Sequence, residues 1–264
     1  MRRENTLSDD ERAVSEAISY VLVFGLMTVG GTLVALQGVP ALENTQEAQL
    51  AENAERAVLL MQDTVEGMVR QDAPRREVTV DVQDFTVGVG GMEPASIDVT
   101  TDGDTLAELE SDPVYIETET VTAVYENGAV LVGERGSSDS WTMASRPSWA
   151  VSTNNSKVRS VFVRSVSATG GSSVTGQGTR ARLVFESVNS RINTTDDVNQ
   201  LEMSVESPRY GAWREYFESL NASVDGGDGT VSGNRVTLKI DSFEGGAGRV
   251  SHRTQVIRAE VGRE

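Results

Sequence analysis

The residues best suited to bind a metal ion are four oxygen-bearing side chains in one short stretch. They alternate along the chain as ligands do at the start of a calcium-binding loop: Asp98, Thr100, Asp102 and Asp104. Such a loop also needs a bidentate glutamate at its twelfth position, which here is Leu109. A second acidic turn, residues 225–229, has the composition of an ordinary solvated β-turn. We therefore expect no metal site and no bound cofactor.

Catalysis needs an activated nucleophile or a paired acid and base, and no recognisable motif supplies either. The single histidine, His252, lies in the polar stretch 249–254, which we interpret as a surface loop. The chain has no Gly-x-Ser-x-Gly, P-loop or His-Glu-x-x-His motif. Because it has no cysteine, it also lacks a thiol nucleophile and disulfide bonds. We expect His252 to be a bystander, no residue to be catalytic, and the protein not to be an enzyme.

The charge of the chain is strongly acidic. Its 264 residues include 40 Asp and Glu against 23 Lys and Arg, a formal net charge of −17, and only Lys157 and Lys239 are lysines. A dense carboxylate surface with arginine in place of lysine is what we expect of a halophilic protein, because high salt screens its self-repulsion. An acidic surface protein from ordinary salt remains the alternative. The charge argues against nucleic acid as a partner, since no basic stripe could neutralise phosphates.

One N-terminal segment is free of charge. Residues 17–42 contain no Asp, Glu, Lys or Arg, and about 20 helical residues suffice to cross a hydrocarbon core of about 30 Å. The segment therefore predicts a helix in the lipid bilayer, with a span at about 17–36. Cations flank its N-terminal side at Arg2, Arg3 and Arg12, whereas the next cation is Arg56. By the positive-inside tendency we expect a single-pass protein with a cytoplasmic N-terminus and an extracellular C-terminal domain.

The residues before this segment resemble a known family. Glu11-Arg12-Ala13-Val14-Ser15-Glu16-Ala17-Ile18, followed by an apolar helix, is similar to the start of archaeal type IV pilins, especially those of haloarchaea. The resemblance implies a class III signal peptide that a prepilin peptidase removes, with cleavage between Arg12 and Ala13. It also implies like pilin subunits as partners, through the N-terminal helix, in a surface filament.

Two features depart from the pilin pattern. Asp9, Asp10 and Glu11 crowd the expected cleavage site, and Glu16 stands where many archaeal pilins have proline. An uncleaved leader would leave a permanent signal anchor, so the alternative is a non-polymerising surface module for binding or adhesion.

Three residues of the helix are candidates for assembly. In pilins a glutamate near the mature N-terminus is thought to pair with the free amine of a neighbouring subunit, a part that the resemblance implies for Glu16. A first-turn glutamate that complements the helix dipole is the alternative. Gly31 and Ala35, four residues apart, allow close approach of helices in lipid, although glycine is simply common in such helices.

Downstream, apolar or small residues recur at steps of three and four, which predicts an amphipathic helix over about 43–72. They are Leu50, Ala54, Val58, Met61, Val65 and Met68. Asp72-Ala73-Pro74 ends the helix, because the residue before proline avoids the α region. We divide the chain into a leader (1–12), an N-terminal helix (13–73) and a head domain (77–264).

From Glu77 onward the hydrophobic period is two, which predicts about nine mostly antiparallel strands in a sandwich or a strongly curled sheet. The candidates are Val78–Val82, Phe85–Val89, Ser96–Thr100, Val114–Val124, Val158–Ser167, Arg180–Glu186, Leu201–Val205, Gly233–Ile240 and Gln255–Val261. Asn127-Gly128 between two strand-forming runs predicts a tight hairpin. Glycine- and serine-rich residues 136–140 and 169–178 predict surface loops.

One helix interrupts the strands. Ser207-Pro208 fits a helix N-cap followed by proline at the first helical position. Tyr210, Trp213, Phe217 and Leu220 then share one helical face. An aromatic stripe could bind a sugar or a partner protein, but packing on a sheet is the usual role, and we expect that here.

Three sequons offer possible N-glycosylation sites outside the cell, at Asn154, Asn193 and Asn221. Together these features predict an α+β protein with a long transmembrane and stalk helix before a β-rich head. The expected function is that of a membrane-anchored, pilin-like surface protein that can join a filament.

Overall fold

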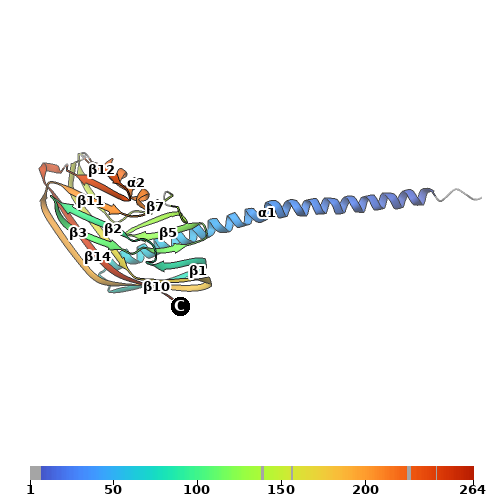
Figure 1. Cartoon of the computed structure of the whole chain (residues 1–264), viewed down its shortest axis with the longest axis horizontal. Coiled ribbons are helices and arrows are strands. Elements are labelled where there is room, and N and C mark those ends of the chain that lie inside the picture. Colours follow the sequence, from blue (N-terminus) through green and yellow to red (C-terminus); the bar gives the residue numbers. More distant parts are fainter. Residues whose placement is uncertain (1–6, 138–139, 156, 225–226, 242) are drawn as a thin grey trace, which may run out of the picture. The chain divides into compact units, whose positions relative to one another are not determined.

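The structure, a computed structural model, describes residues 7–137, 140–155, 157–224, 227–241 and 243–264, with side chains left undescribed at 7–18, 31, 33–44, 83 and 177. It opens with helix α1, Leu7–Arg70 (Figure 1). The chain forms two compact units, Met1–Gln49 and Leu50–Glu264, so that α1 contributes to both. The last turns of α1, which the sequence assigned to a separate stalk, thus belong to the same unit as the strands.

The expected α+β class with a long transmembrane helix is wrong. The structure is mostly β, with 57% of residues in strands and 24% in helices. Within the described ranges, no helix offers a stretch both long and apolar enough to cross a membrane. Sequence reasoning underestimated the strands because several of them are polar and glycine-rich, and these were interpreted as loops.

Nine strands form the larger sheet, sheet A, in the order β7-β6-β5-β4-β1-β10-β14-β9-β8. Their bounds are β1 Arg75–Val89, β4 Val114–Glu117, β5 Val121–Glu126, β6 Ala129–Glu134, β7 Thr142–Ser145, β8 Ala150–Asn154, β9 Lys157–Thr169, β10 Ser172–Val198 and β14 Gly248–Arg263. Neighbours are antiparallel except β14 and β9, which are parallel.

Five strands form sheet B in the order β12-β13-β11-β2-β3, all antiparallel. They are β2 Ala95–Thr101, β3 Asp104–Ser111, β11 Leu201–Glu206, β12 Gly227–Ser232 and β13 Arg235–Ile240. Helix α2 (Tyr210–Asn221) and a short 3₁₀ helix, η1 (Glu244–Gly246), complete the described elements.

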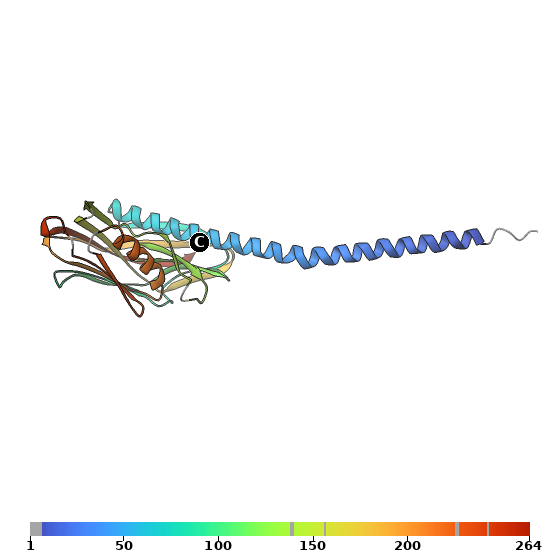
Figure 2. The same ribbon diagram turned by 90° about the horizontal axis from the view of Figure 1, so that it is seen from above.

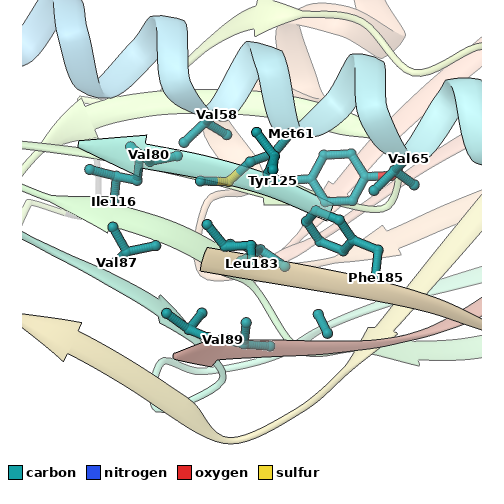
Figure 3. Packing of buried hydrophobic residues seen from close by; sticks show 14 of the residues in the cluster. Val58, Met61, Val65, Val80, Val87, Val89, Ile116, Tyr125, Leu183 and Phe185 are labelled. Atoms are coloured by element: carbon teal, nitrogen blue, oxygen red, sulfur yellow. The ribbon is translucent and has the colours of Figure 1, made fainter. Parts of the chain in front are cut away.

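The C-terminal part of α1 packs on one face of sheet A. Figure 3 shows Val58, Met61 and Val65 of the helix above side chains of several strands of the sheet. This first core is almost solvent-free: Ala54, Val58, Met61 and Val65 of α1 are 0% exposed, as are Leu183 and Phe185 of β10. The steps of three and four in the sequence therefore mark the face of α1 that this sheet covers.

The opposite face of sheet A packs on sheet B and α2 in a second core. The alternation is visible along β6, where Val130 joins the first core and Leu131 the second. Sheet B contributes Ile97, Val99, Met203 and Val205. Sheet A is therefore the middle layer of the second unit, with apolar side chains on both faces, as in Figure 2, where α1 borders the sheets on one side.

The predicted hairpin is confirmed. β5 and β6 pair around Asn127 and Gly128, whose φ angles of 49° and 88° are the positive values that this two-residue turn requires. Unlike most turns it is buried. Gln62 of α1 contacts it and donates from Nε2 to the carbonyl oxygens of Gly128 (2.8 Å) and Arg146 (3.2 Å). One polar side chain of α1 thus ties the helix to the tip of the hairpin.

A buried ion pair joins this hairpin to α2. Glu126 (0% exposed) accepts a hydrogen bond from Nε of Arg209 (2% exposed) and another, of 2.8 Å, from the indole Nε1 of Trp213. The helix begins at Tyr210, two residues later than expected, and the Ser207 hydroxyl accepts from the Arg209 backbone N–H. The predicted packing role of the aromatic stripe is confirmed, since Trp213 and Phe217 are buried.

Several strand predictions were too short or too few. The predicted Val114–Val124 strand is two strands, β4 and β5, separated by a turn in which Thr118 N–H donates to the Val121 carbonyl. The predicted loop 169–178 is wrong, because all but residues 170 and 171 belong to β9 or β10. β10 gains backbone pairing with β1 there, from Ser172 opposite Val89 to Gln177 opposite Gln83, and this pairing overrides the loop-like composition.

The turn between β9 and β10 requires glycine for a steric reason. A Cβ on Gly170 would lie 2.2 Å from the carbonyl oxygen of Ala259 in β14, and one on Gly90 would lie 2.6 Å from the Gly170 carbonyl oxygen. Three backbone segments therefore meet with no room for side chains.

Replacing Glu126 by Gln should destabilise the second unit by about 3–5 kcal/mol, because the buried Arg209 charge loses its counter-charge. The matched control is Glu206→Gln, which alters a half-exposed pair with Arg235 and should cost less than about 1 kcal/mol. Denaturant unfolding of the full chain, followed by tryptophan fluorescence, measures both, since Trp141, Trp149 and Trp213 all lie in this unit. Equal losses in the two variants would contradict the assigned role of the buried pair.

Candidate functional site

The most unusual surface of the described chain is an apolar stretch of α1 in the first unit. Its large side chains are mostly exposed, with exposed fractions from 54% for Val23 to 75% for Leu26. The stretch, called here the apolar segment, comprises Tyr20, Val21, Leu22, Val23, Phe24, Leu26, Met27 and Val29. A contiguous exposed patch of this kind marks a surface that another apolar body covers.

The apolar segment covers every side of the helix. Successive residues of an α-helix are about 100° apart, so the five consecutive residues 20–24 already point in all directions around the axis. A single flat partner could cover only part of them. Full cover needs a surrounding medium or several neighbouring helices.

Two threonine hydroxyls in and just after this stretch bond to the backbone of α1. The Thr28 hydroxyl donates to the Phe24 carbonyl oxygen at 2.8 Å, and the Thr32 hydroxyl donates to the Thr28 carbonyl oxygen at the same distance. Both hydroxyls thereby use the backbone of their own helix as acceptor. No heavy atom lies within 4 Å of a Cβ built on Gly25 or Gly30, so a neighbouring helix could approach closely there.

The residues expected to govern processing and assembly all lie in α1: Arg12, Ala13, Glu16, Gly31 and Ala35. Their side chains are outside the part that the structure describes. These assignments remain predictions.

The acidic residues considered for calcium have other partners. Asp98 accepts from NH1 of Arg235 at 2.9 Å, and Asp102 accepts from the backbone N–H groups of Asn199 and Gln200. The described residues include no cluster of three or more His, Asp or Glu placed to hold a metal ion. Of the second turn, 225 and 226 lie outside the described residues, and Asp228 belongs to β12.

The expectation that His252 lies in a surface loop is wrong. His252 is 0% exposed within β14, and its Nε2 lies 2.9 Å from the Ser165 hydroxyl oxygen of β9. Burial lowers the pKa of His252 to about 4, so its imidazole is neutral at pH 7. The Nδ1 atom of the ring lies 3.3 Å from the Thr254 hydroxyl oxygen, and no carboxylate of the described residues bonds to the ring. Within this part of the chain, the pair has no orienting acid of the kind found in a hydrolytic triad. The sequence signal for the burial of His252 is its spacing of two residues from Val250, an apolar residue that is also buried.

The three sequon asparagines differ in access. Asn154, at the exposed end of β8, donates from its side-chain amide to Glu244, and Asn193 is half-buried within β10. Asn221 ends α2, and its Oδ1 is buried without a hydrogen-bond partner.

The aromatic side chains of α2 join a cluster rather than an open binding face. The ring centroid of Trp149 lies 5.9 Å from that of Trp213, 5.6 Å from Tyr216 and 5.9 Å from Phe217. Tyr216, which the sequence did not single out, is itself buried. Trp149 lies in the loop before β8, and its indole joins the cluster to β9 by donating to the Arg164 carbonyl oxygen.

Fold and surface together define a class of protein: a mostly β domain whose first helix continues from an exposed apolar segment. The chain belongs to DUF7289, a family of unknown function, whose match covers residues 12–260. Neither a curated protein nor a solved structure matches the chain.

Stability should depend on pH through His252. Between pH 6.5, the ordinary histidine pKa, and about 4, the unfolded chain binds a proton at His252 that the folded chain does not bind. This contribution is therefore complete above pH 6.5 and falls as the pH drops to about 4, by roughly 3 kcal/mol. Denaturant unfolding of wild type and His252→Gln at several pH values measures the difference, because other acidic groups titrate equally in both. An unchanged pH dependence in the variant would contradict it.

Proposed function

We propose that the chain is a pilin-like subunit of the cell surface that assembles through its uncharged N-terminal helix. The observation that carries this proposal is the exposure of large apolar side chains on all sides of the helix between residues 20 and 29. The similarity of Glu11–Ile18 to the processing region of archaeal type IV pilins supports it.

The physical reason for assembly is the hydrophobic effect. Burying one Val, Leu, Phe or Met side chain gains roughly 1.5–3 kcal/mol. Because the apolar segment has seven such exposed residues in addition to Tyr20, its complete cover is worth on the order of 10 kcal/mol or more. A bundle of like helices covers all sides, whereas one partner helix covers a single side.

The proposed sequence of events follows from this requirement. The chain is first held at the cell membrane, with the second unit outside the cell. A prepilin peptidase removes residues 1–12, and the apolar segment then enters a core of like helices. The second unit remains in water, where the large negative charge of the chain keeps it soluble.

Sequencing the N-terminus of the protein from native membranes tests the processing step. A chain that begins at Ala13 is the expected result. A chain that retains the Met1 leader would contradict cleavage and would leave the non-polymerising surface module as the function.

A matched pair of substitutions tests assembly itself. Val23→Asp places a charge on the apolar segment, whereas Val188→Asp places one on β10 of the second unit; the two valines are 54% and 53% exposed. Val and Asp have similar helix propensities, so Val23→Asp should leave α1 helical. We expect Val23→Asp to abolish recovery of filaments by high-speed sedimentation and electron microscopy. Val188→Asp should assemble normally.

Filaments of normal yield from Val23→Asp would refute assembly through this helix. Loss of filaments in both variants would show that the assay reports general damage, which circular dichroism of the purified chains would reveal independently.

A further inference from the structure

One end of sheet A extends beyond the helix that covers the rest of its face. α1 ends at Arg70, whereas β10, β14 and β9 continue, as both views show (Figures 1 and 2). Side chains in register on these strands lie side by side: Ile192 with Arg253 and Arg164, and Thr194 with Ser251 and Phe162. Arg253 shares its side of β14 with Ile257 and Ala259, which α1 covers further along. The uncovered end therefore continues the helix-covered face.

This end of the sheet, called here the arginine face, combines apolar and cationic groups. It comprises Phe162, Arg164, Ile192, Thr194, Arg249, Ser251 and Arg253. Ile192 is 60% exposed, among the highest values for a large apolar side chain in the second unit. The Arg164 guanidinium lies 5.6 Å from the ring centroid of Phe162. An exposed isoleucine beside stacked arginine is a composition typical of protein interfaces.

The arginines of this face have spare hydrogen-bond donors. No described carboxylate forms an ion pair with Arg164, and the buried Nε atoms of Arg164 and Arg253 have no hydrogen-bond partner. Arg253 uses one terminal nitrogen for Asp72 (2.6 Å), and Arg249 pairs with Asp196 at the surface. Burial lowers the pKa of Arg164. The nearby Arg253 and Arg70 charges also lower it, whereas the Glu66 charge raises it. Arg164, which is partly exposed and has no ion-pair partner among the described residues, is therefore the arginine best placed to bind a carboxylate of another copy.

A complementary surface exists on the opposite side of the same unit. The outer face of sheet B, called here the carboxylate face, has six acidic side chains by strand register: Asp98, Glu108, Glu110, Glu202, Glu206 and Asp228. Only two cations, Arg235 and Lys239, share it. A groove on this face is lined by Asp98, Glu108 and Glu202 together with Arg235, and Glu108 is exposed.

We propose that the arginine face of one copy binds the carboxylate face of the next copy. The inference rests on the proposed function, in which α1 brings copies together. Because the two faces differ, the contact is heterologous and repeats along a row of copies instead of closing into a dimer. Charge complementarity identifies the partner that binds the arginine face. The arginines favour an acidic surface, and every copy of the chain carries such a surface in its own carboxylate face. Ion pairs covered by such a contact are less screened by salt than exposed ones.

Cysteine cross-linking of the full chain tests the contact. Because the sequence contains no native cysteine, only the introduced thiols can react. Ile192→Cys and Glu108→Cys introduced together, with a short bismaleimide, should give a ladder of cross-linked oligomers from assembled material. Each single variant alone should give none, whereas a mixture of the two singles should give dimers. Ile192→Cys paired with Thr79→Cys, an exposed residue of β1 outside both faces, is the matched control and should give no ladder.

The outcomes separate this inference from the proposed function. A chain that sediments as filaments without forming the ladder overturns the contact and leaves the proposed function standing. Dimers from Ile192→Cys alone overturn it in favour of a two-fold contact. A ladder that persists in the Val23→Asp background supports the contact while contradicting assembly through α1.

Charge reversal gives a second, independent measurement. Arg249→Glu and Glu110→Arg, each introduced into the chain that carries Ile192→Cys and Glu108→Cys, should abolish cross-linking at this contact, and that chain with both charge changes should regain it, because Glu110 is an exposed member of the carboxylate face. Arg258→Glu is the control, because Arg258 is a similarly exposed arginine of the same strand that pairs with Glu186 outside the arginine face. No rescue in the double variant, with normal folding by circular dichroism, would overturn the pairing of these two faces.

Discussion

The burial of both faces of sheet A is the constraint on which the second unit depends. A sheet with apolar side chains on both faces must be covered twice, here by α1 and by sheet B with α2. The cover on the first side comes from the same helix that carries the apolar segment. Gln62 adds a polar tie from α1 to the hairpin tip, and the hairpin in turn binds α2 through Glu126 and Arg209. Helix α1 therefore both covers one face of sheet A and contacts the hairpin that binds α2.

Much of this arrangement follows from local sequence patterns. The steps of three and four from Ala54 to Met68 identify the buried face of α1, and Asn127-Gly128 identifies its hairpin, because both patterns reflect the backbone geometry of a single element. The aromatic stripe of α2 was also assigned correctly to packing. The buried partners of these elements could not be predicted: Glu126 and Arg209 are 83 residues apart, and no local rule joins them.

Other features depended on pairing between distant strands. Residues 187–198 are polar and rich in serine and threonine, yet they extend β10 because β14 offers backbone partners along this stretch, with register shifts after Ser187 and Thr195. The same register buries His252, whose polar neighbours in sequence had indicated a loop. For the surface site, the uncharged run could be recognised from composition alone, whereas the arginine face could not, since its residues come from β9, β10 and β14.

The packing of α1 against sheet A also bears on mechanical strength. Within the second unit, a pull along the axis of α1 would act on the helical residues from Leu50 to Arg70. The helix lies against the sheet along several turns, with Ala54, Val58, Met61, Val65 and Met68 all locked in the core. Tension along the axis would load these contacts in shear, where they must fail together rather than peel apart in succession. The part of α1 that belongs to the second unit should therefore resist extraction along its own length.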